Sequence, residues 1–204
     1  MNRKFFFLFS LLFFSLSSFS QVSFPGTAHD VPFRYKGSSI PRFALKNNLL
    51  LDATLSFNLA AEFRLSRRHT LEVGGSYNPW TFSGNKKFKH WMVQPEFRTW
   101  LCEPFTGHFF GIHPMYGEFN IGHLSIGSLK DHRYDGRFGG GGFSYGYHWY
   151  LSPRWSIEAS VGFGYLYIDY DRYECAHCGD LEKSKHKHYV GPTRAAINLI
   201  YVLK

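Results

Sequence analysis

Residues 155–166 read WSIEASVGFGYL, so that large apolar residues alternate with small or polar ones along the whole stretch. A period of two is typical of a β-strand whose two faces meet different surroundings. The same alternation runs through residues 59–66, 70–77, 91–98, 142–149 and 195–203. Residues 45–55 and 109–121 add two further strands, although the pattern leaves the facing of the second unassigned. The sequence therefore predicts eight strands.

The connections between these strands alternate in length. The short connections are residues 66–69, 102–107 and 152–154. The longer, polar connections are residues 78–89, 122–135 and 171–187. Only the connection near Ser56 departs from this alternation, because it is also short. Short turns on one side and longer loops on the other are typical of outer-membrane barrels. We therefore expect an all-β fold over residues 43–204, an eight-stranded antiparallel up-and-down transmembrane β-barrel with both termini in the periplasm.

The N-terminal segment predicts export. Arg3 and Lys4 precede an apolar run at residues 5–16, and residues 18–20 form a small-x-small cleavage site. These are the three parts of a secretory signal peptide, which we assign to residues 1–20. Residues 21–42 carry several Pro and Gly and are expected to form an irregular periplasmic segment. No nucleic acid is expected as a partner of an exported protein, despite the formal net charge of +8.

The polar face of the strands distinguishes a membrane barrel from a soluble, lipocalin-like ligand carrier. It consists largely of Gly, Ser, Asn and Ala, which fit the narrow interior of eight strands, while Trp, Tyr, Phe, Leu and Val on the other face suit lipid. Charged residues on the polar face should pair with one another, because an unpaired buried charge is costly. The turns suggest that Arg64 lies opposite Glu72 and His148 opposite Glu158. The expected interior network, which leaves no open pore, comprises Lys46, Asp52, Glu62, Arg64, Glu72, Glu96, Arg98, His148, Glu158 and Arg194.

Several blocks of the chain resemble the family of small bacterial outer-membrane proteins catalogued as domain of unknown function 3575. The resemblance covers about residues 43–204. It implies an outer-membrane barrel of a Bacteroidota-type bacterium, with no established activity and no catalytic residues to carry over. It also suggests fimbrial or other envelope proteins as partners. The blocks are ALKNNLLLDA (44–53), NLAAE (58–62), YNPW (77–80), KHW (89–91), QPE (94–96), WLC (100–102), GHFFG (107–111), YGYH (145–148) and CAHCG (175–179).

Cys175 and Cys178 lie in the longest polar connection, with His177 between them. We favour a local disulfide, because cysteines of exported proteins tend to oxidise. A metal half-site completed by His186 or His188 and a redox pair are alternatives, but the helical context of a redox pair is missing. Neither a metal nor another cofactor is therefore expected. Cys102 should stay unpaired, because the height of the barrel separates it from the other two cysteines.

Two polar connections are basic and should lie near the outer leaflet, where lipopolysaccharide phosphates would attract them. Ordinary solvated loops are the alternative reading. The lysines expected to contact lipopolysaccharide are Lys86, Lys87, Lys89, Lys183, Lys185 and Lys187.

These features favour an integral outer-membrane barrel with a structural, anchoring or surface-interaction role, in contact with outer-membrane lipid and lipopolysaccharide. The alternatives are a barrel enzyme that acts on lipid A or on proteins, and the soluble carrier. An enzyme would need a base and a nucleophile near the outer rim. No characteristic spacing stands out among the candidates there, which are Asp131, His132, Asp135, Asp169, Asp171 and His177. We therefore expect no enzymatic activity.

Overall fold

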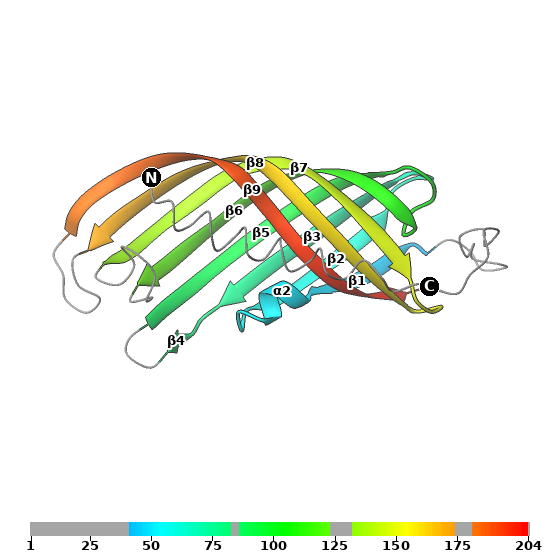
Figure 1. Ribbon diagram of the computed structural model, residues 1–204, viewed down its shortest axis with the longest axis horizontal. Helices are drawn as coiled ribbons and strands as arrows, with labels where there is room; N and C mark the ends of the chain where they lie inside the picture. Colours follow the sequence, from blue (N-terminus) through cyan, green and yellow to red (C-terminus); the bar gives the residue numbers. More distant parts are fainter. Residues whose placement is uncertain (1–40, 83–85, 123–131, 174–180, 204) are drawn as a thin grey trace, which may run out of the picture. The chain divides into compact units, whose positions relative to one another are not determined.

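The computed structural model describes residues 41–82, 86–122, 132–173 and 181–203. These residues form one antiparallel sheet with a single turn of helix, α2 (Leu49–Asp52) (Figure 1). A two-residue strand, β4 (Thr81–Phe82), pairs with β5. The eight long strands are β1 (Phe43–Asn48), β2 (Phe57–Arg64), β3 (His69–Asn78), β5 (Lys86–Trp100), β6 (Gly107–Gly122), β7 (Arg133–Tyr150), β8 (Trp155–Tyr173) and β9 (Leu181–Leu203). The expected signal peptide and most of the segment that follows it lie outside the described residues.

Each long strand pairs with a neighbour on both sides. Most neighbours are consecutive in sequence, and β1 also pairs with β9 while β3 pairs with β5, which makes the sheet barrel-like. The pairing is uneven around the sheet. β8 and β9 pair from Trp155 opposite Tyr201 up to Tyr173 opposite Leu181, whereas β1 pairs with β9 only over Phe43–Asn48. The all-β, antiparallel part of the sequence prediction is thus confirmed.

The two faces of the sheet differ in the way that the alternation predicts. Large apolar side chains point outward, and Phe143, Phe163 and Val190 are 71%, 64% and 81% exposed. Charged and polar side chains point inward and are buried, among them Glu62, Arg98 and Glu158. In a water-soluble domain apolar side chains are buried and charges exposed, so this distribution is the reverse of the usual one.

The facing of β6, which the sequence left open, follows from its burial. Phe109, His113 and Met115 are buried on the inner face, whereas Phe110 and Ile112 are exposed on the outer face. His113 is therefore an interior residue that sequence reasoning did not identify.

Several strand boundaries differ from the predicted ones. The expected first strand over residues 45–55 ends at Asn48, because the Asn48 side chain accepts a hydrogen bond from the Leu50 backbone N–H (3.1 Å) and caps α2. The segments 78–89 and 171–187, expected as loops, are largely strand, since β5 begins at Lys86, β8 extends to Tyr173 and β9 begins at Leu181.

No helix in the described part of the chain has the length and apolar character needed to cross a membrane.

Aromatic residues fill one end of the interior. Phe105, in the turn between β5 and β6, has a positive φ of 63° and is fully buried. Its ring lies 6.0 Å from that of Trp100, which in turn lies 4.9 Å from Phe109. The turn thus folds inward and packs an apolar layer beneath the charged side chains.

Inward glycines make room for the charged side chains, and Gly111 is the clearest case. A Cβ at Gly111 would lie 2.7 Å from Glu96 Oε1, which is too close for two unbonded atoms. We predict that Gly111→Ala destabilises the protein by about 1–3 kcal/mol through overpacking. The shift of the denaturant midpoint of unfolding measures this loss.

Gly139 supplies the matched control, because it faces outward and its Cβ would meet nothing closer than Tyr116 Cδ2 at 3.4 Å. Gly139→Ala should change stability by less than about 0.5 kcal/mol. Equal effects of the two substitutions would contradict the packing argument.

Candidate functional site

Seven charged side chains from six strands meet inside the sheet. They are brought together because each occupies an inward position of its strand, and they are nearly or fully buried. This cluster, called the interior charge cluster below, contains four carboxylates and three permanent cations: Glu62, Glu72, Glu96, Glu158, Lys46, Arg98 and Arg194.

Arg98 lies at the centre of the interior charge cluster. Its Nε donates to Glu96 Oε1 at 2.6 Å, and its Nη1 lies 2.9 Å from Glu158 Oε2. Its Nη2 lies 2.7 Å from Glu72 Oε2, and Glu62 Oε2 is 3.3 Å from Nη1. The guanidinium also lies over the Phe109 ring, 4.3 Å from the ring centroid. Only arginine offers five donors in a planar fork, which is why one side chain can serve four carboxylates.

Lys46 provides the second cation. Its Nζ lies 2.7 Å from Glu158 Oε2 and 3.0 Å from Glu72 Oε2, and it also pairs with Glu62. Lys46 and Arg98 therefore share three carboxylates. This arrangement connects β1, β2, β3, β5 and β8 through side chains, in addition to their backbone pairing.

Arg194 provides the third cation of the cluster. Its Nη2 lies 2.6 Å from Glu72 Oε1, and its Nη1 lies 3.2 Å from Glu96 Oε2 and donates to Gln94 Oε1 at 2.9 Å. The bulge in β9 opposite Gly162 and Phe163 places Thr193 beside it. Thr193 Oγ1 lies 2.9 Å from His113 Nε2, so the bulge adds a hydrogen-bonding residue to the interior.

Two histidines flank the cluster. His113 Nδ1 lies 3.6 Å from Glu96 Oε2, and His148 Nδ1 lies 3.8 Å from Glu158 Oε2. Two further hydrogen bonds reach the cluster from the aromatic layer. Trp100 donates its indole N–H to Thr70 Oγ1 at 2.9 Å, and Thr70 donates to Glu62. His148 lies opposite Glu158 in the pairing of β7 with β8, as expected from the turn at Pro153.

Two of the expected network members lie elsewhere. Arg64 pairs with Thr70 rather than Glu72, because the turn between β2 and β3 is centred on Arg67; it lies at the end of β2, beside Arg42 and Arg67. The expected Arg64–Glu72 pair is therefore wrong. Asp52 is exposed in α2, where it accepts hydrogen bonds from Asn47 and Asn58 at 3.3 and 2.7 Å.

The other residues singled out by the sequence lie on the far parts of the long strands. Lys87 and Lys89 are half-buried on β5, and Lys185 and Lys187 are exposed on β9, so these lysines belong to strands rather than loops. Lys86 and Lys183 belong to the same two strands. Cys102 is a free, exposed cysteine. The residues that lie outside the described part of the chain are Asp131, Cys175, His177 and Cys178.

The outer-rim candidates for acid–base chemistry are engaged in polar contacts. Asp135 accepts from Asn120 Nδ2 at 2.7 Å, and Asp169 lies 3.3 Å from the Arg137 guanidinium. His132 Nε2 lies 2.7 Å from Arg172 Nη2. Within the described ranges, no group of three or more His, Cys, Asp or Glu side chains is arranged to hold a metal ion.

The interior charge cluster holds strands together through its ion pairs. Each of its four carboxylates contacts at least two of the cationic or histidine side chains. The cluster therefore fills the interior and connects the strands that surround it.

Comparison with known proteins identifies a family. The family described as "Protein of unknown function (DUF3575)" has a model that matches residues 12–203. No curated protein and no solved structure matches the chain.

Removal of Arg98 should be strongly destabilising. Arg98→Met keeps the length of the side chain but leaves the four buried carboxylates of the cluster with two of its three permanent cations, Lys46 and Arg194. Breaking a buried ion pair from one side costs about 3–5 kcal/mol, and we expect a loss of that size in the free energy of unfolding, measured by denaturant titration.

Arg137→Met is the matched control, because Arg137 forms a solvent-exposed pair with Asp169 on the outer face. Exposed pairs contribute about 0–1 kcal/mol. If Arg98→Met were no more costly than Arg137→Met, the interior charge cluster would not stabilise the fold.

Proposed function

The chain belongs to the DUF3575 family, and we propose that this member is an integral outer-membrane β-barrel with a structural, anchoring or surface-interaction role and no open pore. One observation carries the proposal: the outer face of the sheet is apolar, while the inner face holds the charges. Such a distribution is stable where the surrounding solvent is hydrocarbon.

The aromatic residues of the outer face support this location. Trp149, Trp155 and Tyr201 lie near one end of the strands, and Trp155 packs edge-on against Tyr201 at 5.0 Å. Trp91 and Tyr116 lie near the other end, with ring centroids 5.7 Å apart. Two levels that contain Trp and Tyr, with an apolar band between them, are typical of strands that cross a bilayer. The predicted signal peptide at residues 1–20 supplies the route of export.

The proposed partners are outer-membrane lipid and lipopolysaccharide. Lys185 and Lys187 are exposed at the second aromatic level, where phosphate groups of lipopolysaccharide would lie. Ion pairs of this kind would add to the contact of the apolar face with acyl chains.

A charge placed in the middle of the outer face distinguishes lipid from water. Phe143 lies between the two aromatic levels and is largely exposed. In a bilayer, Phe143→Arg should destabilise the folded protein by about 2–4 kcal/mol. In water the same change would cost little. Stability is measured by denaturant unfolding in vesicles, and location by the amount recovered in carbonate-washed outer membranes.

His108→Arg is the control, because His108 is also exposed on the outer face but lies near the strand end. Its cost should be about 0–1 kcal/mol. Recovery of the wild-type protein as a soluble periplasmic species, or equal effects of the two substitutions, would contradict the proposed location.

The filled interior predicts that the barrel does not conduct. Eight strands leave a lumen just wide enough for side chains, and here Arg98 and the Trp100–Phe105 layer occupy it. Wild-type protein inserted into planar bilayers should show no steady conductance, with insertion verified by flotation of the same preparation in vesicles. A stable, ohmic channel would favour transport over a structural role.

A further inference from the structure

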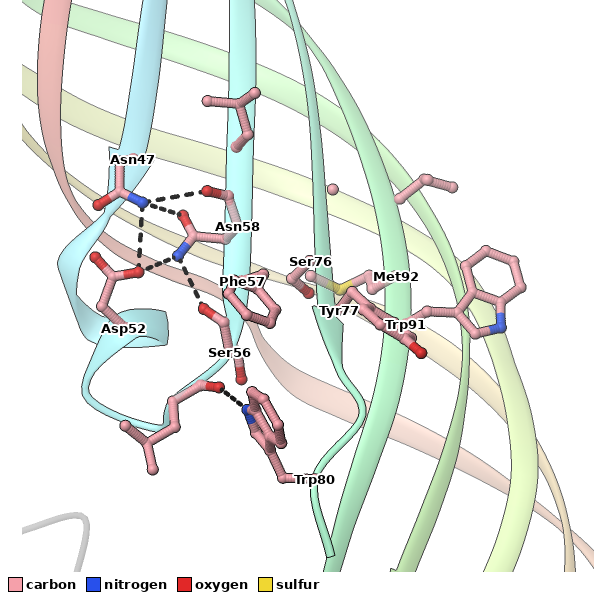
Figure 2. A pocket seen from close by; sticks show the side chains of 14 residues that line it. Asn47, Asp52, Ser56, Phe57, Asn58, Ser76, Tyr77, Trp80, Trp91 and Met92 are labelled. Atoms are coloured by element: carbon pink, nitrogen blue, oxygen red, sulfur yellow. Dashed lines mark hydrogen bonds between the residues drawn. The ribbon is translucent and has the colours of Figure 1, made fainter.

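Two exposed aromatic rings separate an apolar part of the outer face from a polar one. Tyr77 and Trp91 lie opposite each other in the pairing of β3 with β5 and are 55% and 36% exposed. Toward the middle of the strands they line a mostly apolar hollow, which Figure 2 shows. Toward the far ends of β5 and β6 they line a second hollow of about 230 Å³, called the polar hollow below, where charged and amide side chains join them.

Two carboxylates of the polar hollow are oriented through one oxygen each. Glu118 is exposed, and its Oε2 accepts the indole N–H of Trp91 at 2.9 Å. The Asp135 side chain is 45% exposed, and its Oδ2 accepts from Asn120 Nδ2 at 2.7 Å. Glu118 Oε1 and Asp135 Oδ1 make no hydrogen bond to the residues that the structure describes. Each carboxylate therefore keeps an oxygen for a ligand.

Lys89 brings a cation to the same hollow. It lies opposite Asn120 in the pairing of β5 with β6, and Asn120 lies opposite Asp135 in the pairing of β6 with β7. These three residues therefore share one row of the outer face, next to the row of Trp91 and Glu118. Lys89 has no ion pair or hydrogen bond with the described part of the chain, so its ammonium is a free donor.

The mixed charges of the polar hollow determine which ligand fits. An anion would meet Glu118 and Asp135, whereas a cation would meet Lys89. A neutral ligand rich in hydroxyls suits both, because each hydroxyl donates to a carboxylate or accepts from an ammonium. Pyranose sugars carry such hydroxyls around the ring. They also have an apolar C–H face, which packs on exposed aromatic rings such as those of Tyr77 and Trp91.

We propose that the polar hollow binds one pyranose ring of a saccharide, with Trp91 as the stacking surface. Glu118 and Asp135 accept hydrogen bonds from the sugar hydroxyls, and Lys89 donates one. The inference rests on the proposed outer-membrane location. In that location Tyr77 and Trp91 mark the outer interface, so the polar hollow lies just outside the hydrocarbon, where the sugars of lipopolysaccharide begin. Its volume has room for a single ring.

Equilibrium binding to the folded protein in detergent tests the proposal. The probes are rough lipopolysaccharide, and the core oligosaccharide and lipid A that mild acid hydrolysis releases from it. The wild-type protein should bind the lipopolysaccharide and the oligosaccharide saturably. Trp91→Ala removes the stacking surface and should weaken both at least tenfold. Asp135→Ala should weaken both about tenfold, as expected for one hydrogen bond to a charged group.

Each variant has a matched control. Asp171→Ala removes the same charge from the residue opposite Asp135 in the pairing of β7 with β8, which does not line the polar hollow. Trp149→Ala removes an exposed tryptophan near the other end of the strands. Both controls should bind the oligosaccharide as the wild type does. Heat-dependent gel mobility verifies that each variant is folded.

Tighter binding of lipopolysaccharide than of the free oligosaccharide identifies the lipid-attached sugar as the ligand, and equal affinities identify a free saccharide. Three results would overturn the proposal: a wild-type protein that binds no oligosaccharide, affinity that Trp91→Ala leaves unchanged, or displacement of the oligosaccharide by glycerophosphoethanolamine. In the last case a zwitterionic headgroup would be the ligand, with its ammonium at the carboxylates and its phosphate at Lys89.

The fractionation experiment is independent of these measurements. A protein that is found in the outer membrane but binds no oligosaccharide refutes only the sugar site. A soluble periplasmic protein refutes the proposed location, whatever it binds.

Discussion

The contact of Arg98 with four carboxylates is the interaction on which the rest of the structure depends. Those carboxylates come from β2, β3, β5 and β8, so one guanidinium links four strands. A charge buried in this way is tolerated only when it is paired with opposite charges. The surroundings are built to that requirement: Gly111 leaves space for Glu96, and the Trp100–Phe105 layer closes the interior below.

The occupied interior determines the outer face. With many inward positions taken by charged, polar and small residues, most large apolar side chains are left on the outside, where Phe143 and Phe163 are largely exposed. A continuous apolar surface of this kind in water would be an aggregation site. In the proposed bilayer this apolar surface contacts hydrocarbon instead of water. The same sequence pattern therefore accounts for the occupied interior and for the proposed membrane location.

The alternation was sufficient to predict the sheet, the two faces and most of the interior charges, because a period of two depends only on local backbone geometry. It is harder to predict from the sequence which residues lie opposite each other across a turn. The turn at Pro153 was centred correctly and placed His148 opposite Glu158, whereas a turn centred one residue away, at Arg67 instead of Arg68, moved Arg64 by two positions to Thr70. The Thr193 bulge and the α2 cap at Asn48 depend on tertiary contacts that no periodicity reveals.

Asn48 shows how part of the edge of the uneven sheet is satisfied. β1 pairs with β9 only as far as Asn198, although the apolar outer face of β9 continues to Val190. An unpaired strand edge is costly in hydrocarbon. The Asn48 side chain bonds to the Ala195 carbonyl and the Ile197 N–H of that edge, both at 3.3 Å. It also starts α2, the helical turn between β1 and β2. The residue that ends the short strand therefore also satisfies part of the edge that this strand leaves open.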